Sequence, residues 1–489
     1  MSALRRSLAA LACLLPASAQ VPARSPAPRD APRPNVVLCM SDDQGWGDVG
    51  YNGHPWLRTP NLDRLAREGL RFDRFHAASP ICSPARGSVL TGRHPNRFGC
   101  FTFGHVLRPQ EITLAERLRD AGYATGHFGK WHLGSVQVGS PVNPGASGFE
   151  RWLSAPNHYD NDPILSREGR AVRLGGESSM VTAEAAVAFI EEQVEAGRPF
   201  LAVVWFGSPH GPHHAAPIDK TFYRDKDWEG QADWGGEITG VDRAVGRLRN
   251  ELRRLGVADD TLFWFCSDNG GLVEDSSGGR GRKGTVYQGG LRVPALLAWP
   301  ARYPEPLVTD LVASTVDIFP TVLAAAGLEV PAEPPLDGVD LLPLLEGGID
   351  VRPTPLGFWE YPAKRIKKAT GKIMTALLAA QRQGVETAPG AELHLDAAEI
   401  GPPVPTDRFP GHAAWLDWPF KLHRVERAGA TADAPPSIAL ELYDLDADPL
   451  EAHDLAARED RAERVAAMRA QLETWLASVA RSLNGADHE

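Results

Sequence analysis

The run NVVLCM, from Asn35 to Met40, decides which folds the chain can adopt. It carries no charge and is rich in Val and Leu, which is typical of a strand buried on both faces of a parallel sheet. The segment TPNLDRLAREG (59–69) then shows helix signals, because Thr59 can cap a helix, Pro60 suits its first turn, and apolar residues recur along one face. A strand followed by such a helix is the repeating unit of an α/β protein.

The same alternation of helix-like and strand-like runs continues along the chain. The runs are VTAEAAVAFIEEQVEAG (181–197), FLAVVWF (200–206), GVDRAVGRLRNELRRLG (240–256) and TLFWFC (261–266). We therefore expect an α/β domain over residues 34–355, with a large, mostly parallel sheet sandwiched by helices. In that architecture, binding sites gather at the carboxyl ends of the strands.

From Leu356 onward the pattern changes. The runs LGFWEY (356–361), AAWLDWPFKLHRV (413–425) and ALELYDLD (439–446) are typical of short antiparallel strands, and apolar residues recur at helical spacing in the tail. These features predict a smaller C-terminal domain over residues 356–489, built of an antiparallel sheet and a closing helix. Residues 366–407 fit neither pattern.

Charge and the N-terminus limit the partners and the location. The 51 Lys and Arg residues against 62 Asp and Glu give a formal net charge of −11, which disfavours nucleic acid or an anionic membrane as the main partner. Residues 1–19 resemble a signal peptide, and a Pro-rich linker (20–33) follows. Cys13 also allows a lipoprotein signal, although Ala10 stands where a leucine is usual.

No later run is long enough to span a bilayer. The sequence contains no Asn-x-Ser/Thr site for glycosylation, which favours a bacterial periplasm over a eukaryotic secretory route. We expect an exported protein, periplasmic or secreted, and bacterial.

Two pairs of polar residues follow predicted strands. Asp42 and Asp43 come after the first strand, and Asp268 and Asn269 come after the strand TLFWFC. Four oxygen ligands that meet at one edge of the sheet would suit Ca²⁺ or Mg²⁺. Either pair alone could instead cap a helix or start a turn, as we expect for Asp48.

Basic residues occur in glycine-framed clusters. GKWHLG places Lys130 and His132 two residues apart, which would put them on the same side of an extended segment; His210 follows the strand FLAVVWF, and Lys283 lies in a glycine-rich loop. A single loop lysine or histidine is usually a solvated surface group. Three clusters at strand ends in an acidic protein favour a pocket for an oxyanion.

Four cysteines lie beyond the predicted signal peptide, too few for a disulfide framework. Cys39 and Cys266 lie in apolar strands and are expected to be small buried hydrophobes. Cys82 precedes Pro84 and a short predicted helix over 85–90, so it would lie at a helix N-terminus, where a negative charge is favoured. Arg86 is one helical turn away and can reach back to the same place.

The run CSPARGSVLTGR (82–93) resembles the signature of the type I sulfatases, formylglycine-dependent enzymes of the alkaline phosphatase superfamily. Further similar segments occur in the family's order, among them SDDQGWGD, GKWHLG, SPHGPH, SDNGG and KGTVYQGGLRVP. The resemblance covers nearly the whole mature chain. It implies an arylsulfatase-like fold and a sulfuric ester hydrolase.

The resemblance also implies a nucleophile and a cation. Cys82 would be oxidised to formylglycine by a formylglycine-generating maturation enzyme, and its hydrate would attack the sulfate ester. A divalent cation, Ca²⁺ in most members with Mg²⁺ possible, would be held by five residues: Asp42, Asp43, Asp268, Asn269 and the modified Cys82.

The remaining roles concern sulfate and protons. Lys130 and Lys283 would bind sulfate oxygens, and Arg86 would stabilise the charge of the nucleophile. His132 would take a proton from the second hydroxyl of the hydrate, and His210 would assist departure of the alcohol. Two departures from the family pattern are a serine without a clear counterpart and Gln288, where glutamate is common.

The substrate that we expect is a sulfated small molecule or glycan, with a sulfated carbohydrate preferred. Specificity would come from residues 134–173 and 366–407; His213 and His214 could contact a sugar or could be surface residues. One alternative is a phosphodiester or phosphonate monoester hydrolase of the same superfamily. Another is a catalytically silent protein that binds sulfated glycans.

Overall fold

The computed structural model describes residues 33–226, 230–349, 351–427, 429 and 436–488. The predicted signal peptide (1–19) and the linker up to residue 32 lie outside the described residues. No helix in the described ranges combines the length and apolar character that crossing a bilayer would need.

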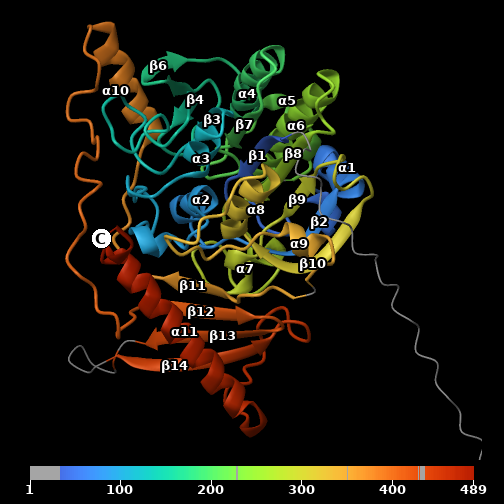
Figure 1. Ribbon diagram of the computed structural model, residues 1–489. Coiled ribbons are helices and arrows are strands. Elements are labelled where there is room, and N and C mark those ends of the chain that lie inside the picture. The colour runs from blue at the N-terminus through green and yellow to red at the C-terminus, as the bar shows by residue number, and fades with distance from the viewer. Residues whose placement is uncertain (1–32, 227–229, 350, 428, 430–435, 489) are drawn as a thin grey trace, which may run out of the picture.

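The larger of two sheets has ten strands (Figure 1). They are β1 (Asn35–Ser41), β2 (Leu70–His76), β3 (Ala124–Lys130), β4 (Arg151–Ala155), β5 (Ile164–Arg167), β6 (Arg170–Arg173), β7 (Phe200–Trp205), β8 (Thr261–Ser267), β9 (Ala295–Ala298) and β10 (Leu307–Ser314). Their order is β10-β2-β9-β8-β1-β7-β3-β4-β5-β6. Of these strands, β9 and β5 run opposite to the others, which confirms a mostly parallel sheet.

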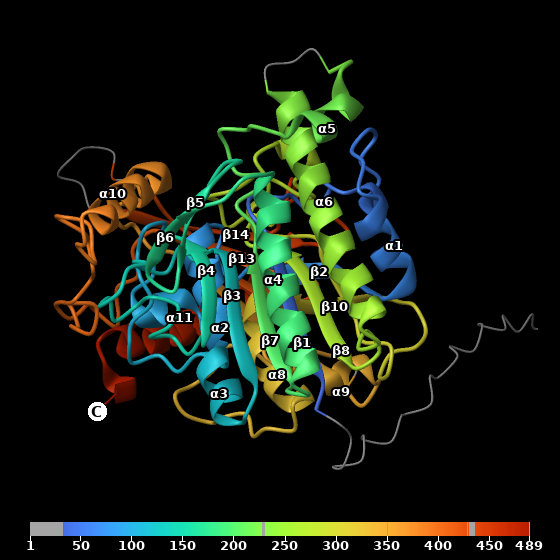
Figure 2. The same cartoon turned by 90° about the horizontal axis from the view of Figure 1, so that it is seen from above.

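Helices cover both faces of this sheet (Figure 2). Residues of α1 (Pro60–Glu68), α4 (Ser178–Glu195) and α6 (Gln231–Arg254) pack with Val37 and Cys39 of β1 on one face. Residues of α2 (Cys82–Thr91), α3 (Leu114–Asp120) and α8 (Ile318–Ala325) pack with Leu38 and Met40 on the other. Each fully buried side chain of this size contributes roughly 1.5–3 kcal/mol, which is why the central strands read as continuous apolar runs.

The second sheet is antiparallel, in the order β11-β12-β13-β14. Its strands are β11 (Leu356–Glu360), β12 (His412–Asp417), β13 (Phe420–Arg427) and β14 (Ser437–Asp444), and α11 (Ala462–Leu483) lies across it (Figure 1). One face packs against α11 through residues such as Trp415 and Leu472, and the other packs against the large domain through Phe358 and Val316. The predicted strands and closing helix are confirmed, whereas the boundary at residue 355 stays a prediction.

Residues 366–407, which fitted no pattern, contain the helix α10 (Thr370–Arg382). This helix returns to the edge of the large sheet, where Gln381 Nε2 donates to Gly169 O at 2.8 Å and Gln381 Oε1 accepts from Ala171 N at 2.8 Å. The remaining short helices are α5 (Pro217–Lys220), α7 (Gln288–Leu291) and α9 (Leu342–Leu345).

Candidate active site

The two acidic pairs meet because their strands are neighbours. β1 and β8 are parallel and in register, with Ser41 opposite Ser267, so the residues that follow emerge side by side. The backbone N–H of Asp43 donates to Asp268 Oδ1 at 3.1 Å. Cys82 Sγ and one carboxylate oxygen each of Asp42 and Asp268 all lie within 4.8 Å of one another.

The residues at this edge fit a divalent cation. Asp42 and Asn269 are 0% exposed, yet Oδ1 of each has no hydrogen-bond partner among the described residues. Buried polar atoms almost always have a partner, so two unsatisfied oxygens beside two further carboxylates are donors that a cation would satisfy. Oxygen donors of this kind suit Ca²⁺ or Mg²⁺.

Three cationic side chains contact the other carboxylate oxygens. Lys130 Nζ lies 2.6 Å from Asp42 Oδ2, and Arg86 Nη2 lies 2.6 Å from Asp268 Oδ2. Lys283 Nζ reaches Asp43 Oδ2 at 2.6 Å from the glycine-rich loop. The predicted basic residues therefore meet the predicted acidic residues at one edge of the sheet.

The local field shifts the pKa values of these groups. Burial alone would raise the pKa of Asp43, but Lys283 and its other cationic neighbours outweigh burial and hold that pKa well below its usual range. Burial and then Asp42 raise the pKa of Asp268 to about 6. Burial also raises the pKa of the Cys82 thiol to about 11. An unmodified Cys82 therefore stays a thiol at neutral pH and is a poor nucleophile.

The helix that carries Cys82 is longer than predicted. α2 spans Cys82–Thr91 rather than 85–90, with Ile81 as its N-cap, so Cys82 is the first helical residue and Pro84 lies in the first turn. Cys82 is 1% exposed. The predicted place of the sulfur at a helix N-terminus is confirmed.

His132 is placed differently from the sequence expectation. β3 ends at Lys130, and His132 has a φ of 56°, so the chain turns and the two residues do not continue one extended segment. The His132 ring is buried, and neither ring nitrogen has a hydrogen-bond partner among the described residues. Burial, reinforced by Lys130, lowers its pKa well below the usual range, so the ring is neutral and one of its nitrogens is unprotonated.

His210 faces the same carboxylates. Its Nε2 lies 3.6 Å from Asp43 Oδ2, and its Nδ1 is 2.6 Å from the carbonyl oxygen of Gly211. Burial lowers the pKa of His210 to about 4. His158, which the sequence analysis did not single out, stacks on His210 with ring centroids 4.1 Å apart. It lies within residues 134–173, which were expected to set specificity, and nothing else in the sequence marked it.

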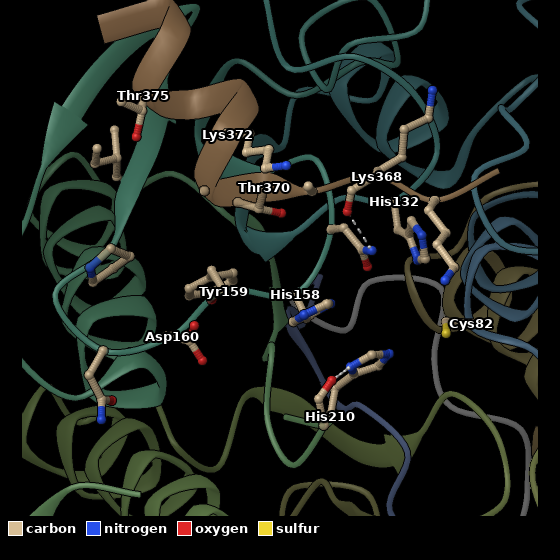
Figure 3. A pocket seen from close by; sticks show the side chains of 18 of the residues that line it. Cys82, His132, His158, Tyr159, Asp160, His210, Lys368, Thr370, Lys372 and Thr375 are labelled. Atoms are coloured by element: carbon tan, nitrogen blue, oxygen red, sulfur yellow. Dashed lines mark hydrogen bonds between the residues drawn. The ribbon is translucent and has the colours of Figure 1, made fainter. Parts of the chain in front are cut away.

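A pocket of about 800 Å³ opens above Cys82 (Figure 3). Cys82, His132, His210 and Lys283 are among the residues that line it, and both segments expected to set specificity contribute to its walls. Residues 157–164 and 173 come from the first segment, and residues 367–372 and 375 come from the second. A hydrogen bond from Asn157 Nδ2 to Lys368 O, at 3.1 Å, joins the two segments.

Several other predicted residues lie outside this pocket. Gln288 Oε1 pairs with His76 Nε2 at 3.0 Å, beneath the second sheet. His213 and His214 are not among the lining residues and pair instead with Glu237 and Asp160.

Three further expectations about individual residues are confirmed. Asp48 Oδ2 accepts from Gly45 N at 2.7 Å, as expected for a turn residue. Cys39 and Cys266 are free and buried in the core.

Curated relatives with sequence similarity are sulfatases. N-acetylgalactosamine-6-sulfatase from Canis lupus familiaris is 34% identical over 361 residues, which cover 64% of this chain and 66% of that enzyme. Arylsulfatase A from Bos taurus is 36% identical over 372 residues, covering 67% of this chain and 71% of that enzyme. This chain thus spans about two thirds of the length of the relatives that it matches.

Solved structures with the same fold include proteins bound to saccharides. Ps i-CgsB in complex with k-i-k-neocarrahexaose has a TM-score of 0.74 at 23% identity, covering 94% of this chain and 95% of that chain. A protein solved with its substrate, D-glucosamine-2-N,6-O-disulfate, has a TM-score of 0.68 at 20% identity, covering 94% of this chain and 100% of that chain. The phosphonate monoester hydrolase of Agrobacterium radiobacter has a TM-score of 0.59 at 23% identity, covering 91% of this chain and 96% of that chain. At these identities the likeness shows the fold alone.

The sulfatase family model matches residues 34–328, more than half of the 489 residues. The match contains Cys82 and the acidic and basic residues that surround it. The chain therefore belongs to the sulfatase family.

Proposed function

We propose that this protein removes sulfate from a sulfated carbohydrate, with formylglycine made from Cys82 as nucleophile and a divalent cation at Asp42, Asp43, Asp268 and Asn269. The observation that supports it best is the place of Cys82, which lines a pocket of about 800 Å³ and whose Sγ lies within 4.8 Å of an oxygen of each of two buried carboxylates. The modified residue would complete the ligand set of the cation.

Modification of Cys82 would replace a poor nucleophile, the buried thiol, with a hydroxyl group that can attack sulfur. The thiol is buried and its pKa is raised to about 11, so it offers little thiolate for attack. Oxidation to formylglycine would supply an aldehyde hydrate, with one hydroxyl to attack sulfur and a second to release sulfate afterwards. A serine at this place would leave a stable sulfate ester on the enzyme.

The cationic side chains would hold the sulfate group. Lys283 lines the pocket beside Cys82, and Lys130 lies behind it, paired with Asp42. Bound Ca²⁺ or Mg²⁺ would act as a Lewis acid that polarises a sulfate oxygen and lowers the pKa of the nucleophilic hydroxyl. Arg86 donates to Asp268 through two nitrogens and would stabilise negative charge on the nucleophile.

Two histidines would move protons. His132 has two ring nitrogens without partners, and its lowered pKa keeps the ring unprotonated, so one nitrogen is free to take the proton of the second hydroxyl. His210 keeps Nδ1 on Gly211 O, so Nε2 faces the site and would donate to the departing alcohol oxygen. An anionic sulfate in the pocket would raise the low pKa of His210 and favour the protonated ring.

A carbohydrate substrate is supported by the pocket and by the relatives. The walls carry hydrogen-bonding side chains, including Asn157, Asp160 and Asn161, which suit sugar hydroxyl groups. Two named relatives of this fold or family act on amino-sugar sulfates. We further propose that the protein is exported and that a formylglycine-generating enzyme acts on it.

The test compares purified enzyme, with the state of Cys82 established by mass spectrometry, on an aryl sulfate, an aryl phosphonate and defined sulfated saccharides. We expect the highest kcat/KM on a sulfated saccharide. A higher value on the phosphonate would favour the phosphonate monoester hydrolase, whose fold this chain shares. Saccharide binding without turnover, with Cys82 unmodified, would favour a silent binding protein.

A further inference from the structure

The pocket wall across from Cys82 is formed by the first turn of α10. Thr370, Gly371 and Lys372 of this 13-residue helix line the pocket. Its N-cap is Ala369, which makes no side-chain hydrogen bond to the first turn. The first N–H groups of a helix lack intrahelical partners and carry partial positive charge, and an alanine cap leaves them open.

The side chain of Thr370 gives independent evidence for a ligand at this turn. Thr370 is 6% exposed, and its Oγ1 has no hydrogen-bond partner among the described residues. Figure 3 shows this hydroxyl directed into the pocket, beside Lys372 and across from Cys82. Leaving a buried hydroxyl without a partner costs free energy, so an acceptor supplied by a bound molecule would satisfy it.

The charges around this turn favour an anion. Lys367, Lys372 and Arg173 line the pocket, and the described part of the chain contains no ion pair for any of them. The neighbouring Lys368 differs because it forms an ion pair with Glu392. These unpaired cations are notable in a chain with a net charge of −11.

The carboxylates of the pocket already have partners. Asp160 Oδ1 lies 3.1 Å from His214 Nδ1, and Asp162 Oδ1 accepts from Gly176 N at 2.8 Å. Lys367, Lys372 and Arg173, which form no ion pair among the described residues, outnumber these two carboxylates, so the pocket lining carries a net positive charge.

We propose that the first turn of α10, with Thr370, Lys367 and Lys372, binds a second anionic group of the substrate, distinct from the sulfate ester cleaved at Cys82. The group is an oxyanion, either another sulfate or a carboxylate, on the same sugar or on the next one. This inference rests on the proposed function and narrows its substrate to a glycan with at least two anionic groups.

The first experiment measures binding, so that it does not depend on turnover. Calorimetry of the cation-loaded Cys82→Ala protein would use three disaccharides that share one sulfate and differ at a second position, which carries hydroxyl, sulfate or carboxylate. We expect the second anionic group to tighten binding about tenfold, as a charge-assisted hydrogen bond does. Tightening by sulfate, carboxylate or both identifies the group; equal affinity for all three disaccharides would overturn the proposal.

Variants locate the effect. In the same background, Thr370→Val and Lys372→Gln should each reduce the advantage of the second anionic group about three- to tenfold. Lys364→Gln is the matched control, because Lys364 is exposed and does not line the pocket. If the second anionic group still tightens binding as strongly in both test variants, or if this gain in affinity falls equally in the control, the anion site is not at the first turn of α10.

Turnover separates this inference from the proposed function. For enzyme with formylglycine, the ratio of kcat/KM on the dianionic disaccharide to kcat/KM on the singly sulfated one should fall in Thr370→Val and Lys372→Gln. An unchanged ratio rejects the second anion site but leaves the sulfatase proposal intact. Failure to hydrolyse any sulfate ester rejects the sulfatase proposal, while the calorimetric result still decides the anion site.

Discussion

Lys130 Nζ and Asp42 Oδ2 lie 2.6 Å apart in a fully buried ion pair that joins the ends of β3 and β1. Together with Arg86–Asp268 and Lys283–Asp43, it balances three carboxylates with three cationic side chains. A divalent cation would add two positive charges, and the site would then attract an anionic sulfate. Metal binding and sulfate binding should therefore be coupled.

The first prediction tests this coupling by removing the cation. Dialysis against a chelator should abolish turnover and weaken binding of a non-hydrolysed sulfate ester at least tenfold, because the carboxylates would again neutralise Lys130 and Lys283. Activity and calorimetric affinity, measured on the chelated protein and again after Ca²⁺ or Mg²⁺ is restored, would test this coupling. Full affinity in the chelated protein would contradict the coupling.

Asp268→Asn tests the ligand set with a side chain of the same size. We expect this variant to lose most of its bound Ca²⁺ or Mg²⁺, measured by elemental analysis, and nearly all turnover. Asp260→Asn is the control, because Asp260 is exposed before β8. Arg86 loses its closest partner in Asp268→Asn, so a thermal melt must show that the variant is folded. A folded variant with a full metal content would remove Asp268 from the ligand set.

Cys82 should be found as formylglycine when the protein is produced together with a maturation enzyme. Mass spectrometry of the tryptic peptide from Phe75 to Arg86 measures the conversion, and activity should rise in proportion to it. Cys82→Ser, which keeps a hydroxyl but cannot form a hydrate, should turn over no more than once. Full activity with only the thiol present would exclude the proposed nucleophile.

Among the ten strands of the large sheet, the sequence predicted β1, β7 and β8 together with the polar residues that follow them, because both depend on local runs. It missed the N-terminal part of α6, which begins at Gln231 and continues through the glycine-rich run before Gly240. That part is stabilised by contacts distant in sequence, because Trp234 and Ile238 pack in one buried cluster with Leu57. No local sequence pattern predicts such contacts, so this part of the helix was missed.

The remaining differences have similar causes. α10 packs on a hairpin about two hundred residues earlier, through contacts such as Gln381 to Gly169, so its tertiary role has no local pattern. The turn at His132 requires a positive φ on a non-glycine residue. Packing around the buried ring stabilises this conformation, and no sequence pattern predicts it. His158 was missed because one loop histidine is usually solvated, and only the fold stacks it on His210.

Glu451 should hold the C-terminal sheet on the large domain. Its Oε1 lies 2.9 Å from Lys421 Nζ and from His423 Nε2, and its Oε2 accepts from Gln288 N at 2.6 Å. Glu451→Gln breaks a buried ion pair and should lower the free energy of unfolding by about 3 kcal/mol. Thermal melts of Glu451→Gln against Glu459→Gln, an exposed control in the same domain, would measure the loss.

The same carboxylate predicts how stability depends on pH. Burial would raise the pKa of Glu451, but Lys421 and His423 outweigh it and lower that pKa from 4.5 to about 2. Because the folded-state pKa is depressed, the stabilisation is present above about pH 4.5 and is lost as the pH falls towards 2. Wild type should lose more stability over this interval than Glu451→Gln, and parallel losses would contradict the assignment.

The last prediction concerns His210, whose Nε2 faces the site while Nδ1 is held by Gly211. General acid catalysis typically contributes about 10²–10⁴-fold, and it matters most when the departing alcohol is a poor leaving group. A sugar hydroxyl is poor, whereas a nitrophenol leaves with little need for a proton. His210→Ala should therefore reduce kcat on a sulfated sugar far more than on nitrophenyl sulfate, with metal content unchanged. His158→Ala, which removes only the stacked ring, controls for loss of packing around His210. Equal losses on both substrates would assign His210 to sulfate binding, and no loss on either would exclude it from the reaction.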